Sequence, residues 1–133
     1  MKHTRQVIAL LAGATLAAGT AMVAVADHHG GEKKNPKDIH DVMEWTHKGR
    51  ESMVAKVRDG NGTAAEIETL LRYYKFMATQ KPPQGDEAAW KERTAALVAA
   101  TEKLAKKSPD AIENYKKAVN CKACHDVHKP KDE

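Results

Sequence analysis

Residues Ser108–His125, SPDAIENYKKAVNCKACH, contain the features from which the fold is predicted. Ser108 is a suitable N-cap, and Pro109 suits the first position of a helix. Apolar side chains then recur at helical spacing, at Ile112, Tyr115, Ala118 and Val119. This segment therefore predicts a helix that begins near Ser108 and continues into two cysteines.

Three further helices are predicted upstream. Their expected bounds are Pro36–Arg58, Thr63–Gln80 and Asp86–Ala105. Thr63 and Glu66 have the spacing of a capping box at the start of the second helix, and Asp86 can cap the third. No segment alternates apolar and polar residues as a strand would. We therefore expect residues 39–133 to form an all-α domain, an antiparallel four-helix bundle.

The N-terminus has the features of an export signal. Lys2 and Arg5 precede an apolar run, and Ala24-Val25-Ala26 gives the small-x-small pattern that signal peptidase recognises. We expect residues 1–26 to be a signal peptide, residues 27–38 a flexible segment, and the mature chain to be periplasmic or exported to an equivalent compartment. The alternative is a retained membrane anchor, because the apolar run approaches spanning length.

The composition limits the class of protein. The formal net charge is +4, and two of these charges lie in the leader, which leaves a charge too small to indicate nucleic-acid binding. Only 5% of the residues are aromatic, with a single Phe. The helices therefore have little bulky apolar material for a core, and a buried cofactor would supply apolar surface of its own.

Cys121-Lys122-Ala123-Cys124-His125 is a C-x-x-C-H motif, the signal for covalent attachment of haem. Two thiols three residues apart on a helical turn can reach the two vinyl groups at one side of a porphyrin. The imidazole that follows then lies under the iron, for which it is a good ligand. We expect one haem c, attached to Cys121 and Cys124, with His125 as the proximal iron ligand.

Other uses of the two cysteines are weaker alternatives. A thioredoxin-like pair needs a strand–helix unit, which this sequence does not predict. A zinc site could combine the cysteines with His125 and His128, but adjacent ligands fit the usual spaced pairs poorly. A bare disulfide across so short a loop adds little stability. A zinc site or a disulfide would make the chain a small interaction module.

The leader, the four helices and a C-x-x-C-H motif at the end of the fourth helix resemble the class II cytochromes c. This family includes cytochrome c prime and its low-spin, methionine-ligated relatives, and the specific part of the resemblance is residues 121–125. Class I cytochromes c carry the motif near the N-terminus and a ligand Met after it, whereas no Met follows Met77 here. The resemblance implies a haem in the bundle core, with the first helix on the distal side of the iron.

The resemblance makes a residue of the first helix decide the function. Met43 is the candidate distal ligand, and His47, one turn later, is the alternative. A ligated iron implies an electron carrier, whereas an open position implies a protein that binds nitric oxide or carbon monoxide. Met43 could also be ordinary core packing. We expect Met53 in the core, and His40 and His128 at the surface. His128 follows the motif by three residues and could at most flank the edge of the haem.

The expected function is therefore single-electron transfer between redox proteins, without enzymatic activity. Lysines crowd the end of the chain that attaches the haem, at Lys116, Lys117, Lys122, Lys129 and Lys131. They suit docking of an acidic redox partner, although a solvated helix face would have the same composition. Donor, acceptor and reduction potential are not determined by the sequence. The oligomeric state is also open, with a homodimer among the alternatives.

Overall fold

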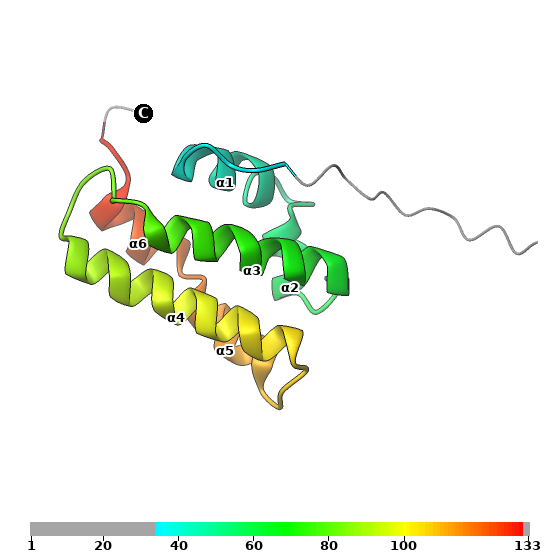
Figure 1. Cartoon of the computed structure of the whole chain (residues 1–133). Coiled ribbons are helices and arrows are strands. Elements are labelled where there is room, and N and C mark those ends of the chain that lie inside the picture. The colour runs from blue at the N-terminus through cyan, green and yellow to red at the C-terminus, as the bar shows by residue number, and fades with distance from the viewer. Residues whose placement is uncertain (1–33, 132–133) are drawn as a thin grey trace, which may run out of the picture. The chain divides into compact units, whose positions relative to one another are not determined.

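The computed structural model describes residues 34–131, so the predicted signal peptide and most of the predicted flexible segment lie outside the described residues. Within this range the chain forms six helices and no strand, which confirms the prediction of an all-α protein (Figure 1). The helices are α1 Ile39–Thr46, α2 Met53–Arg58, α3 Ala64–Thr79, α4 Glu87–Ala105, α5 Ala111–Ala118 and α6 Cys121–His128.

The two longest helices, α3 and α4, pack against each other, and α5 packs on α4 (Figure 1). The short helices α1 and α2 both contact α3. The predicted caps are confirmed: the Thr63 hydroxyl accepts the N–H of Glu66, the Glu66 carboxylate accepts the N–H of Thr63, and Asp86 accepts the N–H of Ala89. Buried side chains from five helices form one core, with Leu70, Tyr74, Met77, Trp90, Leu97, Leu104 and Tyr115 among its larger members.

The prediction of one helix over Pro36–Arg58 is wrong, because two helices, α1 and α2, occupy this stretch. Gly49 lies between them with φ +90°, a left-handed conformation that interrupts a helix and that glycine adopts without steric cost. Ser52 then starts α2 by accepting the N–H of Ala55 on its hydroxyl. The local capping signal therefore prevails over the continuous apolar spacing.

The predicted fourth helix is also divided in two. Its start at Ser108 is wrong, because α5 begins at Ala111, after Asp110 with φ +57°, and the N–H of Ala111 donates to the Ser108 carbonyl at 3.2 Å. Its continuation into the cysteines is wrong as well. Asn120 accepts the N–H of Ala123 on its side chain at 3.0 Å and so starts a separate helix, α6. The two cysteines are therefore at the start of a helix.

The loop between α3 and α4 holds α6 in place. The Gln84 side-chain amide donates to the Lys129 carbonyl, and the Gln84 carbonyl lies 3.0 Å from Nδ1 of His128. Gly85, with φ +82°, allows the backbones to approach closely, since a Cβ there would lie 2.7 Å from the Val127 carbonyl oxygen. None of the principal helix–helix contacts between residues 34 and 131 involves α6. The position of α6 therefore depends on this loop.

Gly49 and Gly85 provide a matched test of that contact, because both have positive φ but a Cβ at Gly49 would meet nothing within 4 Å. We expect Gly49→Ala to lower the free energy of unfolding by about 1 kcal/mol through backbone strain alone. Gly85→Ala should lower it by at least about 1 kcal/mol more, because the new methyl group displaces α6. Urea unfolding followed by circular dichroism measures both variants. Equal losses would contradict a tight contact between α6 and the loop.

Candidate functional site

Two adjacent cavities lie beside α6, with volumes of about 620 Å³ and 230 Å³. Met43, Cys124 and His125 line both of them. The larger cavity extends to the α3–α4 loop, where its lining includes Gln80, Lys81, Pro83, Trp90 and His128. The smaller one extends along α4 and α5, where its lining includes His47, Met77, Leu97, Val119 and Cys121. Together they have the size of a small-molecule or cofactor site.

The start of α6 presents the two cysteines to this space. Asn120 caps the helix, so Cys121 and Cys124 follow one helical turn apart. Both thiols are free; Cys121 is exposed, and Cys124 is half-buried. Burial raises the pKa of the Cys124 thiol. His125 follows directly, is exposed, and lines both cavities. The predicted haem-attachment residues are therefore together at the cavities.

The first helix contributes the predicted distal candidates. Asp38 caps α1, which carries Met43 in its middle and is followed directly by His47. Met43 is half-buried and packs against the core while it lines both cavities. His47 lines only the smaller cavity. Met53, on α2, packs against the core as predicted. The structure thus brings Met43, His47 and the three motif residues to one place, although they are about 80 residues apart in sequence.

Both ring nitrogens of His47 are engaged in a chain of hydrogen bonds. The Thr46 hydroxyl donates to the Val42 carbonyl at 2.6 Å, so it accepts from Nδ1 of His47 at 2.7 Å. Nε2 of His47 therefore accepts, and the Tyr74 hydroxyl lies 3.4 Å from it. Tyr74 is in turn 3.0 Å from the Tyr115 hydroxyl, which can donate to it. This chain of hydrogen bonds links α1, α3 and α5, and its member His47 lines the smaller cavity.

The surroundings of these hydrogen-bonded side chains favour their uncharged forms. Burial, with a smaller contribution from the nearby charge of His125, lowers the pKa of His47 from 6.5 to about 4. Burial also raises the pKa of Tyr115 to about 12 and that of Tyr74 well above 10. At neutral pH the side chains of His47, Tyr74 and Tyr115 are therefore all uncharged, and the smaller cavity borders a neutral imidazole.

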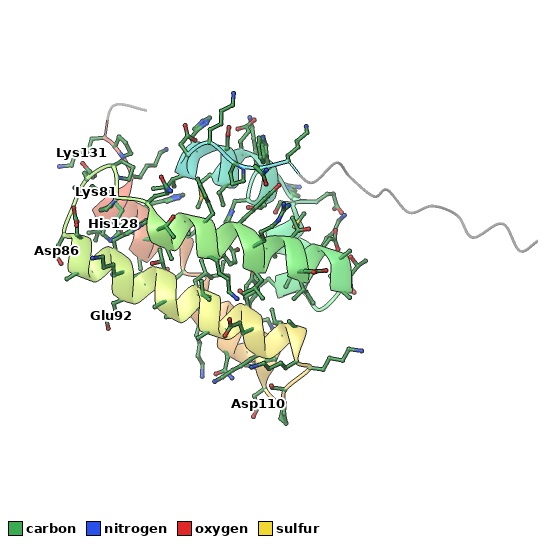
Figure 2. All side chains as sticks on the ribbon, viewed as in Figure 1. Lys81, Asp86, Glu92, Asp110, His128 and Lys131 are labelled. Atoms are coloured by element: carbon green, nitrogen blue, oxygen red, sulfur yellow. The ribbon has the colours of Figure 1, made fainter. Side chains whose placement is uncertain are left out.

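The prediction that His128 lies at the surface is wrong, because only 2% of this residue is exposed. Figure 2 labels this side chain on α6. Its Nδ1 donates to the Gln84 carbonyl, and its ring meets that of Trp90 edge-on, with 5.2 Å between centroids. Its Nε2 is buried and has no hydrogen-bond partner among residues 34–131. His128 is four residues from Cys124 and three from His125, a spacing that places side chains on one helix face. That spacing predicted a position beside the motif, but it gave no signal for the burial of His128.

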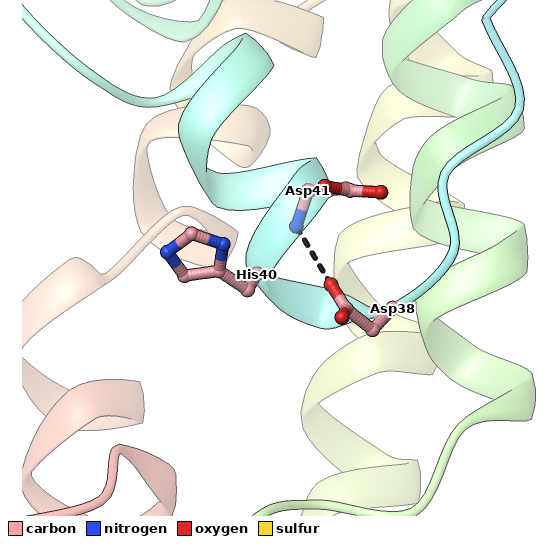
Figure 3. Close-up of side chains that lie close together, drawn as sticks. All are labelled: Asp38, His40 and Asp41. Carbon is pink, nitrogen blue, oxygen red and sulfur yellow. Dashed lines mark hydrogen bonds between the residues drawn. The ribbon is translucent and has the colours of Figure 1, made fainter.

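Asp38, His40 and Asp41 cluster at the start of α1, with ligand atoms within 4.8 Å of one another (Figure 3). His40 is exposed, as predicted. The Asp38 carboxylate accepts the N–H of Asp41 at 2.9 Å, and the Asp41 carboxylate accepts the N–H of Lys37 at 2.9 Å. Both carboxylates are thus engaged in capping α1, which accounts for their positions without a metal ion.

No protein-family model, no curated protein and no solved structure matches this chain. In the part of the chain that the structure describes, no helix has both the length and the hydrophobicity needed to cross a bilayer. The chemistry of the site is therefore the basis on which a function can be assigned.

The groups around the cavities fit a haem. Two free thiols three residues apart can form thioether links, and an imidazole and a thioether are among the usual axial ligands of haem iron. Much of the lining is apolar, as a porphyrin requires, with Ile39, Pro83, Trp90, Leu97, Ala118 and Val119 contributing. His128, another residue of the larger cavity's lining, carries a buried Nε2 that has no partner among the described residues.

The lowered pKa of His47 predicts a loss of stability in acid. Below pH 6.5 the unfolded chain binds a proton at His47 that the folded chain takes up only near pH 4. The contribution of His47 to the free energy of unfolding is therefore fully present above pH 6.5. It is lost as the pH falls from about 6.5 to 4, and the loss is at most about 3 kcal/mol. His47→Gln, which does not titrate, should lose correspondingly less free energy of unfolding over this range. Urea unfolding at pH 7 and pH 4 tests this, and equal losses in both proteins would contradict it.

Proposed function

We propose that this chain is an exported, monohaem c-type cytochrome that carries single electrons between redox proteins, with the haem enclosed by an antiparallel helical bundle. One observation carries this proposal: the C-x-x-C-H residues Cys124 and His125 line the same two cavities as Met43. A haem-attachment motif beside a space of suitable size, with a second ligand at hand, is the combination that a ligated c-type haem requires.

Each residue has a defined role in this proposal. Cys121 and Cys124 hold the haem through thioether bonds, and His125 binds the iron from α6. The haem supplies one-electron chemistry when bound, whereas the protein sets its ligation, its exposure and its potential. Met43 on α1 would supply the second iron ligand, and a thioether ligand would raise the reduction potential. The apolar lining keeps water from the iron and so favours the less charged, reduced state.

Met43 is preferred over His47 as the distal ligand. Nδ1 of His47 donates to Thr46, and its Nε2 faces the Tyr74 hydroxyl. If iron bound Nε2, the Tyr74 hydroxyl would lose this nitrogen as its acceptor. A buried hydroxyl without a hydrogen-bond partner is costly. Met43 loses no hydrogen bond on binding iron, and it lines both cavities rather than one. In this arrangement His47 is a neutral neighbour of the ligand.

The proposed partner is a redox protein with an acidic docking face. Cys121 and His125 are exposed, so an attached haem would have an edge near the surface. Lys117, at the smaller cavity, and Lys129, at the larger one, are exposed there as well. Positive charge around an exposed haem edge increases the rate of encounter with an acidic partner, and salt reduces the effect. We expect electron transfer to slow as ionic strength rises.

Haem attachment is tested by mass spectrometry of the protein expressed in a host with a haem-attachment system. The purified chain should lack residues 1–26 and carry the added mass of one haem. Cys121→Ser and Cys124→Ser should each weaken haem retention in acid–acetone extraction, and the double variant should yield the bare polypeptide. An unmodified chain that carries no haem, or that keeps the leader, would contradict the proposal.

The distal ligand is tested by visible spectroscopy of three variants. Met43→Ala should convert the iron from low spin to high spin and allow the reduced protein to bind carbon monoxide rapidly. Met53→Ala is the matched control, since Met53 packs on the core and should leave the spectrum unchanged. His47→Ala should also keep the iron low-spin.

Two other results would change the assignment. Loss of the low-spin spectrum in His47→Ala, with the Met43 variant unaffected, would make His47 the ligand and retain electron transfer. An unmodified protein that is already five-coordinate and binds carbon monoxide freely would favour gas binding in place of electron transfer.

A further inference from the structure

The ring of His128 is fixed by a bond that uses only one of its nitrogens. The Gln84 carbonyl can only accept a hydrogen bond, so Nδ1 of His128 carries the hydrogen at this 3.0 Å contact. The edge-on contact with Trp90 fixes the ring plane. Nε2 is then left buried and without a partner among the described residues, in a side chain that lines the larger cavity. A buried polar atom of this kind is costly unless something in the cavity bonds to it.

The larger cavity has two chemically different ends. Met43, Cys124 and His125 lie at the end shared with the smaller cavity. His128 lies at the other end, where α6 meets the α3–α4 loop, and Lys81 of that loop lines the same cavity; Figure 2 labels both residues. Lys129 is exposed and contributes positive charge to the lining, whereas Lys81 is paired with Glu87 at 3.6 Å and Asp38 lines the same cavity from the start of α1. The occupant that suits this space has an apolar body and an acidic edge at the His128 end.

We propose that Nε2 of His128 forms a hydrogen bond with a carboxyl group of the ligand, which is a haem propionate. The proposal rests on the proposed function, and it names the residue that orients the acidic edge of the haem. One proton lies between Nε2 and the carboxyl oxygen. The bond also supplies the partner that this nitrogen lacks among the described residues.

The order of residues along α6 supports this assignment. Cys121 and Cys124 bind the vinyl edge of a c-type haem, and His125 binds the iron. The propionates project from the porphyrin edge opposite the vinyl groups. Since a helix advances about 1.5 Å per residue, His128 lies about 6 Å beyond Cys124 along α6, in the direction away from Cys121. His128 cannot be the second axial ligand, because it is on the same helix as His125 and one iron needs its axial ligands on opposite faces.

The first test is nuclear magnetic resonance of the reduced, haem-loaded protein labelled with ¹⁵N-histidine. We expect a proton on the His128 Nε2–propionate bond to exchange slowly with water and to show a nuclear Overhauser effect to the propionate methylene protons. His128→Phe keeps a flat ring against Trp90 but should lose this signal. His128→Gln replaces the nitrogen with a side-chain amide, which should give a protected amide proton near the same methylene groups.

The second test is the ratio of oxidised to reduced protein in a fixed redox buffer. His128→Phe should raise this ratio about threefold or more, because an uncompensated carboxylate stabilises ferric iron. His128→Gln should recover much of the change. Gln84→Ala is the control, since it removes the side-chain bond to the Lys129 carbonyl and leaves both nitrogens of His128 in place. Its ratio should match that of the unmodified protein.

The outcomes separate this inference from the function on which it rests. If mass spectrometry finds no attached haem, both are overturned. If haem is attached but the unmodified protein gives no signal linking His128 to a propionate, the inference about His128 fails and the cytochrome assignment remains. The same holds if Gln84→Ala changes the redox ratio as much as His128→Phe does, because the effect would then come from loosening α6. Should His128→Phe fail to fold, the unmodified protein and His128→Gln still decide the question.

Discussion

Asn120 accepts the N–H of Ala123 on its side chain and so starts α6 as a helix separate from α5. This break decides where the cysteines lie. A helix that continued straight from α5 would carry Cys121 and Cys124 onward along its own axis. The turn at Val119 and Asn120 lets α6 lie against the loop between α3 and α4, with Met43 of α1 at the same cavities. The proposed attachment residues, the proposed distal ligand and His128 are neighbours because of this turn.

Two of the helices that form the site, α1 and α6, are short. Isolated helices of eight residues are not stable in water, so α1 and α6 depend on packing for their structure. For α1 that packing comes from α3, whereas α6 depends on the loop contacts at Gln84 and Gly85. A ligand that binds between these helices stabilises the folded state through its affinity for it. We therefore expect covalent haem to contribute strongly to the order of α6.

The buried polar groups near the cavities divide into two kinds. His47, Tyr74 and Tyr115 satisfy one another through hydrogen bonds, so they can border an apolar site at little cost. Nε2 of His128 is different, because it is buried without a partner in the described part of the chain. A satisfied network defines the shape of a site, whereas an unsatisfied atom indicates what the site binds. This contrast is why His128, and not His47, is assigned to the ligand.

The sequence by itself determined the fold class and the long helices. Helical spacing and the caps at Thr63 and Asp86 are local signals, and the structure confirms the helices that they begin. The spacing of Cys121, Cys124 and His125 is likewise sufficient to predict a haem, and this remains a prediction. Local signals also existed for the two breaks, at Ser52 and Asn120, but the apolar spacing that continues across them favoured longer helices.

Only the tertiary structure decided which of these residues meet. Burial of His128 requires Gly85 and Trp90, which are about 40 residues away in sequence, and local spacing shows only that His128 shares a face with the motif. The hydrogen bonds from Thr46 to Tyr115 likewise cross three helices. They engage His47 and so make it a less suitable iron ligand, and no local sequence signal indicates them. Capping and periodicity depend on neighbours within about one helical turn. Burial and hydrogen-bond partners depend on distant segments, so they were not accessible to that reasoning.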